Sequence, residues 1–325
     1  MIEVKVFAEG VARQMKDYLP EAYQDMTCKV TEQQKNNGTV RIGLLLERPG
    51  ARIAPIVYME PFYVEVQKGK PMERVMIEIA EICERSLEIK VLPEQIDMTD
   101  YDAVKEYLSI QVMNQKANQK LLSHLPHKEM EDLAVICRIE FPVTDGEEIG
   151  TIKVTEELLS LWGVDQETVY QKALENTEKK NPPILTNMNA ILKENLGIQP
   201  ESSNLLETEK GAIDSVDPVE GLYVLRNKTQ IDGASVLAYP KLPEQLQKAF
   251  PQGYYILPSS VHEVLIVPKD HPVTPKELGE MVREINRQEV AREEVLSDRV
   301  YEFDKETGRL CQVPESMERT KERER

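Results

Sequence analysis

The chain has 325 residues, of which 41% are hydrophobic and 30% are charged, and its formal net charge at pH 7 is −17. A chain of this length can form two domains with substantial cores, and its hydrophobic content excludes a disordered acidic chain. Binding to duplex nucleic acid without sequence preference needs Lys and Arg to neutralise phosphates. We therefore expect a folded protein that does not bind nucleic acid directly.

The sequence contains no apolar stretch of the ~18–20 residues that a membrane span requires, and its N-terminus lacks the pattern of a signal peptide. Its four cysteines, Cys28, Cys83, Cys137 and Cys311, lie in apolar patterns and form no C-x-x-C pair. Structural zinc sites usually contain such pairs, and reduced core thiols are typical of the cytoplasm. We expect a cytoplasmic protein with no membrane segment and no metal site.

The spacing of apolar residues predicts an α-β-β-β-α order at the start of the chain. Two runs in which every second residue is apolar lie on either side of Asn36-Asn37-Gly38. This pattern predicts a hairpin, because Asn and Gly tolerate positive φ in the turn. A helix packed on an antiparallel sheet follows from this order. The expected elements are a helix at 4–19, strands at 26–31, 40–46 and 53–59, and a helix at 72–83.

The middle of the chain contains segments with the apolar spacing of strands and segments with that of helices. Thr155 and Asp165 are suitable N-caps for two of these helices. The expected strands are 107–113, 133–141 and 149–154, and the expected helices are 115–125, 155–161, 165–178 and 187–196.

Residues 198–218 differ from the rest, with five acids, one base and several Pro, Gly and Ser residues. We expect an N-terminal α+β domain at 1–197, an acidic linker or exposed loop at 198–217, a C-terminal α/β domain at 218–313 and a charged tail at 314–325. The loop supplies about a quarter of the net charge and is a candidate for contact with a partner.

The last third returns to short strands and helices. Thr274-Pro275-Lys276-Glu277 is a capping box at the start of one helix. The whole chain is thus expected to have an α+β fold of two parts, with antiparallel or mixed sheets and packed helices. The expected strands are 222–226, 234–238, 254–257, 262–267, 300–303 and 310–313, and the expected helices are 242–250 and 275–285.

The first candidate site is the turn Ser259-Ser260-Val261-His262-Glu263, which lies between two apolar strands. Hydroxyl, imidazole and carboxylate groups are the elements of an activated nucleophile, although the members of a triad usually come from distant segments. Strand alternation places His262 and Glu263 on opposite faces. The alternatives are a structural turn with a buried histidine, a binding site or a catalytic site, and Asp232 is a further candidate beside it.

The second candidate site contains His127, Glu129 and Asp132, which could bind a divalent cation or supply a general base. Pro126 interrupts the regular helical face that a pair of histidine ligands needs, so a polar turn is the main interpretation. The sequence also lacks the P-loop and Rossmann glycine motifs. We therefore expect no cofactor.

Four stretches resemble a large family of uncharacterised proteins of anaerobic Gram-positive bacteria, often associated with mobile elements. They are residues 35–38, 125–135, 255–264 and 295–301. The resemblance implies a bacterial accessory protein and no mechanism. The leading hypothesis is a non-enzymatic cytosolic accessory or interaction protein whose partner is another protein. The alternatives are a small-molecule-binding protein or hydrolase with a pocket at Ser259 to Glu263, and an acidic decoy of a nucleic-acid-binding protein.

Overall fold

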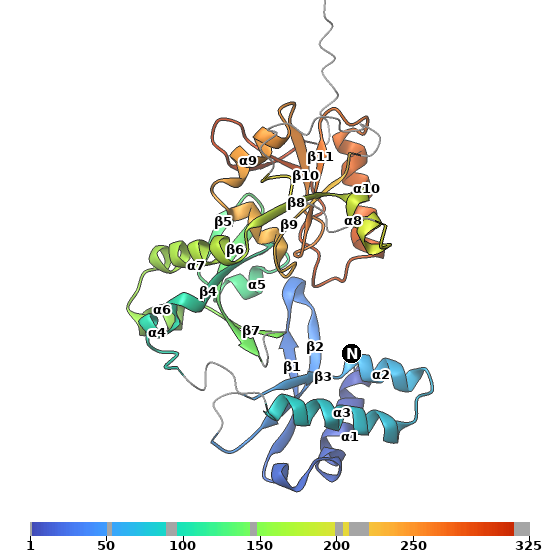
Figure 1. Cartoon of the computed structure of the whole chain (residues 1–325). Helices are drawn as coiled ribbons and strands as arrows, with labels where there is room; N and C mark the ends of the chain where they lie inside the picture. The colour runs from blue at the N-terminus through green and yellow to red at the C-terminus, as the bar shows by residue number, and fades with distance from the viewer. Residues whose placement is uncertain are drawn as a thin grey trace, which may run out of the picture. The chain divides into compact units, whose positions relative to one another are not determined.

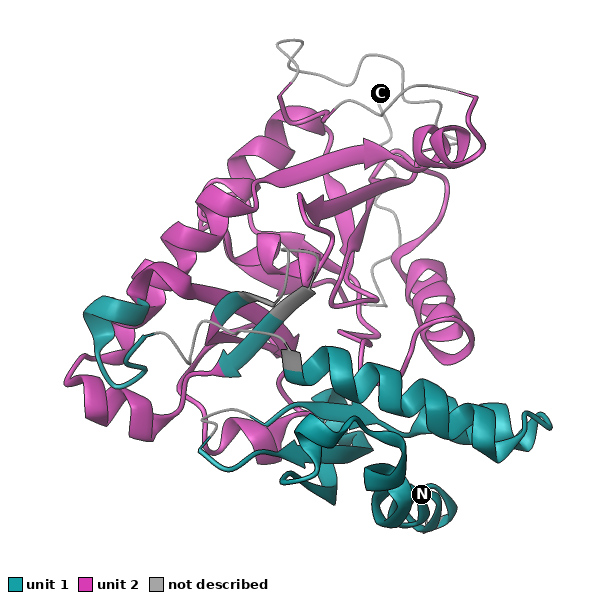
Figure 2. Cartoon of the chain, turned by 60° about the horizontal axis from the view of Figure 1, so that its bottom comes forward, with its two compact units in different colours: residues 1–104, 140–152 teal, residues 105–139, 153–325 magenta. Residues whose placement is uncertain are grey.

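The computed structural model describes residues 2–50, 54–88, 96–143, 148–198, 204–207 and 221–314. Helices accompany antiparallel sheets in it, which confirms the predicted α+β fold (Figure 1). The chain divides into two compact units, each discontinuous in sequence (Figure 2). Unit 1 contains residues 1–104 and 140–152, and unit 2 contains residues 105–139 and 153–325.

Unit 1 contains a three-stranded antiparallel sheet in the order β1-β2-β3. Its core combines apolar residues of the sheet with the apolar stripes of the helices, and Val11, Leu44 and Ile79 are completely buried. The main elements of this unit are α1 (Ile2–Gln14), β1 (Thr27–Gln34), β2 (Val40–Glu47), β3 (Ile56–Tyr58), α2 (Glu60–Gln67), α3 (Met72–Glu88) and α4 (Tyr101–Val104).

The predicted hairpin of unit 1 is confirmed. β1 and β2 pair antiparallel, with Thr27 opposite Glu47 and Gln34 opposite Val40. Asn37 and Gly38 in the connecting turn have φ values of 57° and 67°. These are the left-handed conformations that Asn and Gly adopt at low cost, so the turn residues determine the register of the pair.

Unit 2 combines a large antiparallel sheet, in the order β13-β12-β10-β11-β9-β8, with a sheet in the order β4-β6-β5, and β7 pairs with β6. The strands of these sheets are β4 (Leu108–Asn114), β5 (His127–Met130), β6 (Leu133–Val143), β7 (Glu148–Lys153), β8 (Pro183–Asn187), β9 (Tyr223–Asn227), β10 (Tyr254–Leu257), β11 (Val264–Pro268), β12 (Tyr301–Phe303) and β13 (Leu310–Gln312). Residues 140–143 of β6 and 148–152 of β7 belong to unit 1.

Several helices of unit 2 begin at residues whose side chains cap them. The side chains of Thr155 and Asp165 accept backbone hydrogen bonds at the first turns of α6 and α7, and Thr274 and Glu277 form the predicted capping box of α10. The α-helices are α5 (Gln119–Leu122), α6 (Glu156–Trp162), α7 (Gln166–Lys180), α8 (Met188–Asn195), α9 (Leu242–Ala249) and α10 (Pro275–Gln288).

Several local predictions differ from the structure. The strand expected at 234–238 is the buried 3₁₀ helix η6 (Gly233–Ala238), and the helix expected at 115–125 is reduced to the single turn of α5. The strand expected from residue 262 begins at Val264. For η6 the reason is tertiary: the backbone of Gly233 approaches His262 so closely that a Cβ atom there would lie 2.0 Å from the His262 carbonyl oxygen.

The observed units divide the chain elsewhere than at the expected loop. β8 and β9 lie on either side of residues 198–217 and pair antiparallel, with Leu185 opposite Leu225. This pairing places segments before and after the loop in one sheet. Most of the expected loop and all of the expected tail except Pro314 lie outside the described residues.

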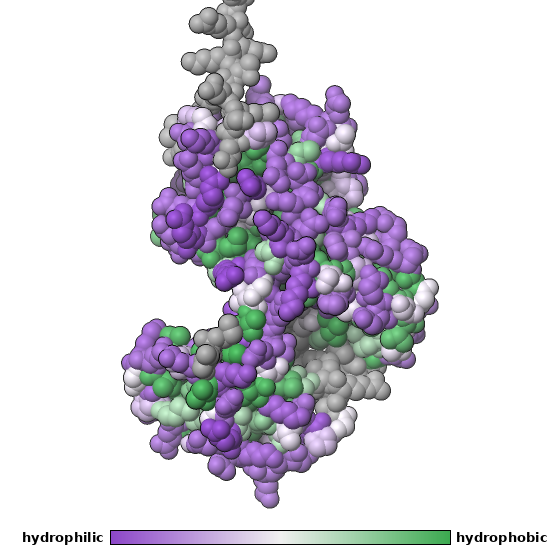
Figure 3. All heavy atoms as spheres, turned by 180° about the vertical axis from the view of Figure 1, so that it is seen from behind, coloured by the Kyte–Doolittle hydropathy of each residue, from purple (hydrophilic) through white to green (hydrophobic). Residues whose placement is uncertain are grey.

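The face drawn in Figure 3 is mostly hydrophilic, with hydrophobic residues in separate groups. Single exposed apolar side chains such as Val6, Ile77 and Leu161 are ordinary on protein surfaces. Within the described ranges, no helix combines the length and the apolar character of a membrane span.

All four cysteines are free, and Cys83 and Cys137 are buried. Burial raises the pKa of each of these two thiols to about 12, compared with about 8.5 for an exposed thiol. Both therefore stay protonated at pH 8, where an unfolded cysteine is partly thiolate and reactive.

We predict that iodoacetamide at pH 8 leaves Cys83 and Cys137 unmodified in the folded chain, because a buried neutral thiol is a poor nucleophile. Both should react within minutes after unfolding in guanidinium chloride. Mass spectrometry of the peptides reports each site, and rapid native labelling of either residue would contradict the burial described above.

We predict that Thr274→Ala lowers the free energy of unfolding by about 1 kcal/mol, because the first turn of α10 loses its capping box. Thr274→Ser keeps the hydroxyl and is the matched control. Urea unfolding of the full chain measures both variants, and equal midpoints for Thr274→Ala and the wild type would show that the cap contributes nothing.

Candidate functional site

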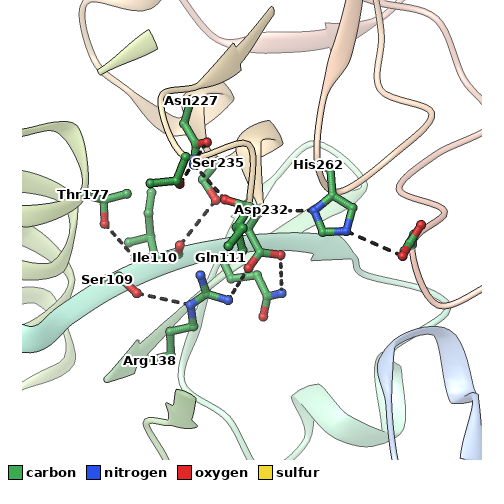
Figure 4. Close-up of polar contacts among 12 residues, drawn as sticks. Ser109, Ile110, Gln111, Arg138, Thr177, Asn227, Asp232, Ser235 and His262 are labelled. Carbon is green, nitrogen blue, oxygen red and sulfur yellow. Dashed lines mark hydrogen bonds and ion pairs between the residues drawn. The ribbon is translucent and has the colours of Figure 1, made fainter. Parts of the chain in front are cut away.

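A buried ion pair lies where η6 meets β4 and β6 in unit 2 (Figure 4). The Arg138 guanidinium on β6 donates to Asp232 Oδ2, and the side chains are 7% and 10% exposed. Gln111 Nε2 on β4 donates to Asp232 Oδ1 at 2.9 Å, and Arg138 Nε donates to Ser109 Oγ at 3.2 Å. Each partner also has a polar neighbour, as a buried charge requires.

Asp232 also fixes the orientation of His262, but through its backbone. The Asp232 N–H donates to His262 Nδ1 at 3.2 Å, so Nδ1 acts as an acceptor and carries no proton. His262 Nε2 lies 3.7 Å from the Glu294 carboxylate, and the His262 side chain is 40% exposed. The structure therefore brings together two residues that the sequence separates by thirty positions.

The serine turn is held between two segments by its backbone. Ser259 accepts the Leu296 N–H through its carbonyl oxygen at 3.0 Å, and Val261 N–H donates to the Glu294 carbonyl oxygen at 2.8 Å. On the other side, the Val261 carbonyl oxygen accepts the Ala234 N–H of η6 at 3.0 Å. The turn thereby connects η6 to the segment before β12.

The polar side chains of this turn support the same backbone. Ser260 Oγ accepts the backbone N–H of His262 at 3.1 Å. An activated nucleophile would instead donate its hydroxyl hydrogen to the imidazole. The carboxylate paired with the His262 ring is that of Glu294, whereas Glu263 is half-buried directly before β11. These contacts favour the structural interpretation of the turn.

The second candidate set is divided among different partners. His127 Nδ1 donates to the Leu125 carbonyl oxygen at 2.8 Å, and Glu129 accepts a hydrogen bond from Gln115 Nε2 at 3.1 Å. Asp132 accepts one from the Tyr301 hydroxyl at 2.5 Å. In the part of the chain that the structure describes, no three His, Cys, Asp or Glu side chains are arranged to hold a metal ion.

Asp132 belongs to a short buried chain of hydroxyl groups that the sequence did not reveal. Tyr301 on β12 is completely buried, and Ser297 Oγ lies 2.6 Å from its hydroxyl oxygen. Burial and the Asp132 carboxylate raise the pKa of Tyr301 well above its usual value, so its hydroxyl stays protonated and donates to Asp132. This chain links the β5–β6 turn to the large sheet.

A cleft of about 780 Å³ lies in unit 2, lined by segments from several parts of the sequence. The strand β5 and its turn contribute Lys128 to Glu131, and β13 with the preceding turn contributes Gly308 to Cys311. β5 and β13 are the outermost strands of their two sheets. The other lining residues are Val135, Tyr170, Leu237, Ala238, Tyr239, Pro240, Pro243 and Phe303.

Charged and aromatic groups border this cleft. Lys128 Nζ lies 4.1 Å from the centre of the Tyr170 ring and 2.6 Å from the Glu167 carboxylate. Sequence reasoning missed the cleft because its residues come from five separate segments without a common motif. The one local signal was the short polar run at 127–130, which was interpreted as a turn but is an edge strand.

Residues 4–305 match the model of a protein family described as a family of unknown function (DUF5688). The chain belongs to this family. The match spans residues of both units, and it confirms the predicted resemblance to an uncharacterised family. No curated protein and no solved structure matches the chain. A function for this chain must therefore be argued from its own geometry.

We predict that Asp232→Ala destabilises the chain by roughly 3–5 kcal/mol, because it removes the carboxylate to which the buried Arg138 guanidinium and Gln111 Nε2 donate. Adding Arg138→Met to this variant should restore part of the stability. Denaturant unfolding of both single variants and the double variant measures the coupling.

The control for this cycle is Lys248→Ala, which removes an ion pair with Glu244 on the exposed side of α9. It should leave the unfolding midpoint unchanged, since exposed pairs contribute little. Additive effects of the two buried substitutions would show that Arg138 and Asp232 do not depend on each other.

Proposed function

We propose that this protein is a non-enzymatic interaction protein that binds a segment of another protein in the unit 2 cleft. The observation that carries the proposal is the presence of two edge strands, β5 and β13, along one cleft. An edge strand presents backbone donors and acceptors to which an extended peptide can pair. A cleft between two such edges is suited to a strand-like ligand.

The size and lining of the cleft support a binding role. Its volume of about 780 Å³ lies within the range of about 300–1,000 Å³ that is usual for ligand sites. Tyr170, Phe303 and Pro243 supply rigid apolar surface, and aromatic residues are enriched where proteins bind one another. The Ser260 hydroxyl and the His262 ring each accept a hydrogen bond from a backbone N–H group, of His262 and Asp232 respectively. This arrangement weighs against the hydrolase hypothesis.

A second candidate function is small-molecule binding in the same cleft. The observation in its favour is the combination of the Tyr170 ring with the cationic groups of Lys128 and Arg309. Such a combination suits a flat anionic compound. The two functions differ in the ligand that should bind, so one series of experiments separates them.

The proposal includes a cytoplasmic location. It rests on four free cysteines, two of which are buried as neutral thiols. Free thiols are maintained in reducing compartments.

The proposed function is tested with the full chain and a displayed library of random linear twelve-residue peptides. We predict that peptides selected on the wild type bind at least tenfold more weakly to Ala238→Trp, in which an indole fills part of the cleft. Fluorescence anisotropy with the labelled peptides gives the affinities.

Ala117→Trp is the matched control, because Ala117 is exposed in the turn before α5 and does not line the cleft. It should bind the selected peptides like the wild type. Failure to select any peptide on the wild type, or equal binding by Ala238→Trp, would contradict the proposed function.

A further inference from the structure

The imidazole of His262 is bonded in a way that only its neutral form permits. Nδ1 accepts the backbone N–H of Asp232 at 3.2 Å, so the ring hydrogen of this state is on Nε2 (Figure 4). A protonated imidazole carries a hydrogen on both nitrogens and has no acceptor. Uptake of a proton therefore removes this bond and sets two N–H donors against each other.

The other ring nitrogen faces a group that favours the protonated form. Nε2 lies 3.7 Å from the Glu294 carboxylate, and the side chains of His262 and Glu294 are 40% and 42% exposed. Solvent therefore reaches the ring, and the adjacent carboxylate stabilises the cation that a proton creates. Histidine is the side chain whose charge changes between about pH 5 and 8. The ring thus has two alternative partners, and its charge decides between them.

Charged groups approach His262 from three directions. Asp232 lies at the start of η6, but its carboxylate binds the buried Arg138 guanidinium, which compensates its charge. Glu294 comes from the segment before β12, and Glu263 follows His262 directly in the chain. The carboxylates of Glu294 and Glu263 both favour the protonated ring, whereas the backbone N–H of Asp232 favours the neutral one.

The bond from His262 supports an uncommon backbone conformation. Asp232 has φ 48° and ψ 38°, left-handed values that few residues with a Cβ atom adopt. It is also the N-cap of η6, and its side chain forms no capping hydrogen bond. The next contact, from the Ala234 N–H to the Val261 carbonyl oxygen at 3.0 Å, involves no group that titrates. Loss of the imidazole bond therefore loosens the start of η6 without detaching it.

We propose that His262 is a pH-sensitive switch at the start of η6. The neutral imidazole binds the Asp232 backbone, and the protonated imidazole releases it and pairs with Glu294. The opposite end of η6 supplies Leu237 and Ala238 to the wall of the cleft, so the switch acts on that wall. The switch operates without a ligand in the cleft and is therefore independent of the proposed function.

The test is an NMR titration of the full, isotope-labelled chain from about pH 8 to about pH 5. The ring nitrogens of His262 should report an unprotonated Nδ1 at the upper limit and two protonated nitrogens at the lower limit. The amide resonance of Asp232 should move over the same range, because this N–H loses its acceptor. The amides of Leu237 and Ala238 should move with the same midpoint.

His262→Asn is the main variant, because the amide oxygen of asparagine can replace Nδ1 as the acceptor and takes up no proton in this range. At about pH 5, the Asp232 amide hydrogen should exchange with solvent at least threefold faster in the wild type than in His262→Asn. At about pH 8, the two rates should be equal.

Two further variants complete the series. Glu294→Gln keeps the bond to Asp232 but removes a charge that favours the protonated ring, so its transition should need a lower pH than that of the wild type. His124→Gln removes a histidine that is exposed elsewhere in unit 2, and it is the matched control. It should titrate at His262 like the wild type.

Three results would overturn the switch. The first is an unprotonated Nδ1 that persists at about pH 5, which the wild type alone reports even if His262→Asn does not fold. The second is equal exchange of the Asp232 amide in the wild type and His262→Asn at that pH. The third is a fixed position of the Leu237 and Ala238 amides while Asp232 moves, which would contradict the action on the cleft wall. Peptide binding to the cleft at about pH 8 is measured separately, so the proposed function stands or fails on its own.

Discussion

The buried ion pair between Arg138 and Asp232 determines much of the geometry of unit 2. Asp232 is the residue at which the chain enters η6 in a left-handed conformation, and its carboxylate is bound from β4 and β6. The same residue orients His262 through its backbone N–H. The side chain of Asp232 bonds to β4 and β6 of one sheet, and its backbone bonds to the turn that connects β10 and β11 of the other sheet. Asp232 is therefore a polar connection between the two sheets of the unit.

The cleft depends on this connection. Its wall includes the end of η6 and residues from both sheets, and the position of η6 follows from the Asp232 contacts. A second polar chain, from Asp132 through Tyr301 to Ser297, joins the β5–β6 turn to β12. The two edges beside the cleft are thus held by buried hydrogen bonds rather than by apolar packing alone. Such networks give a site a defined width, because each bond has a narrow range of distance and angle.

Local sequence patterns predicted the elements whose causes are local. The Asn37-Gly38 turn, the N-caps Thr155 and Asp165 and the capping box at Thr274 all depend on neighbouring residues, and all are present. η6 could not be predicted in this way, since its apolar residues resemble a strand and its shape depends on the close approach of Gly233 to His262. The partners of Asp232 lie 94 and 121 residues away. No spacing rule in a single sequence reveals such contacts.

The interleaved order of the two units has a consequence for synthesis. Unit 1 is completed by residues 140–152, which emerge from the ribosome after the first part of unit 2. β8 cannot form its backbone hydrogen bonds with β9 until residues 223–227 have been synthesised. Pairing between distant segments slows folding, and an unpaired strand is prone to association in the meantime. A chain interrupted after residue 197 would therefore contain all of unit 1 but end with β8 lacking its neighbour, so no single cut in the gene separates the two units.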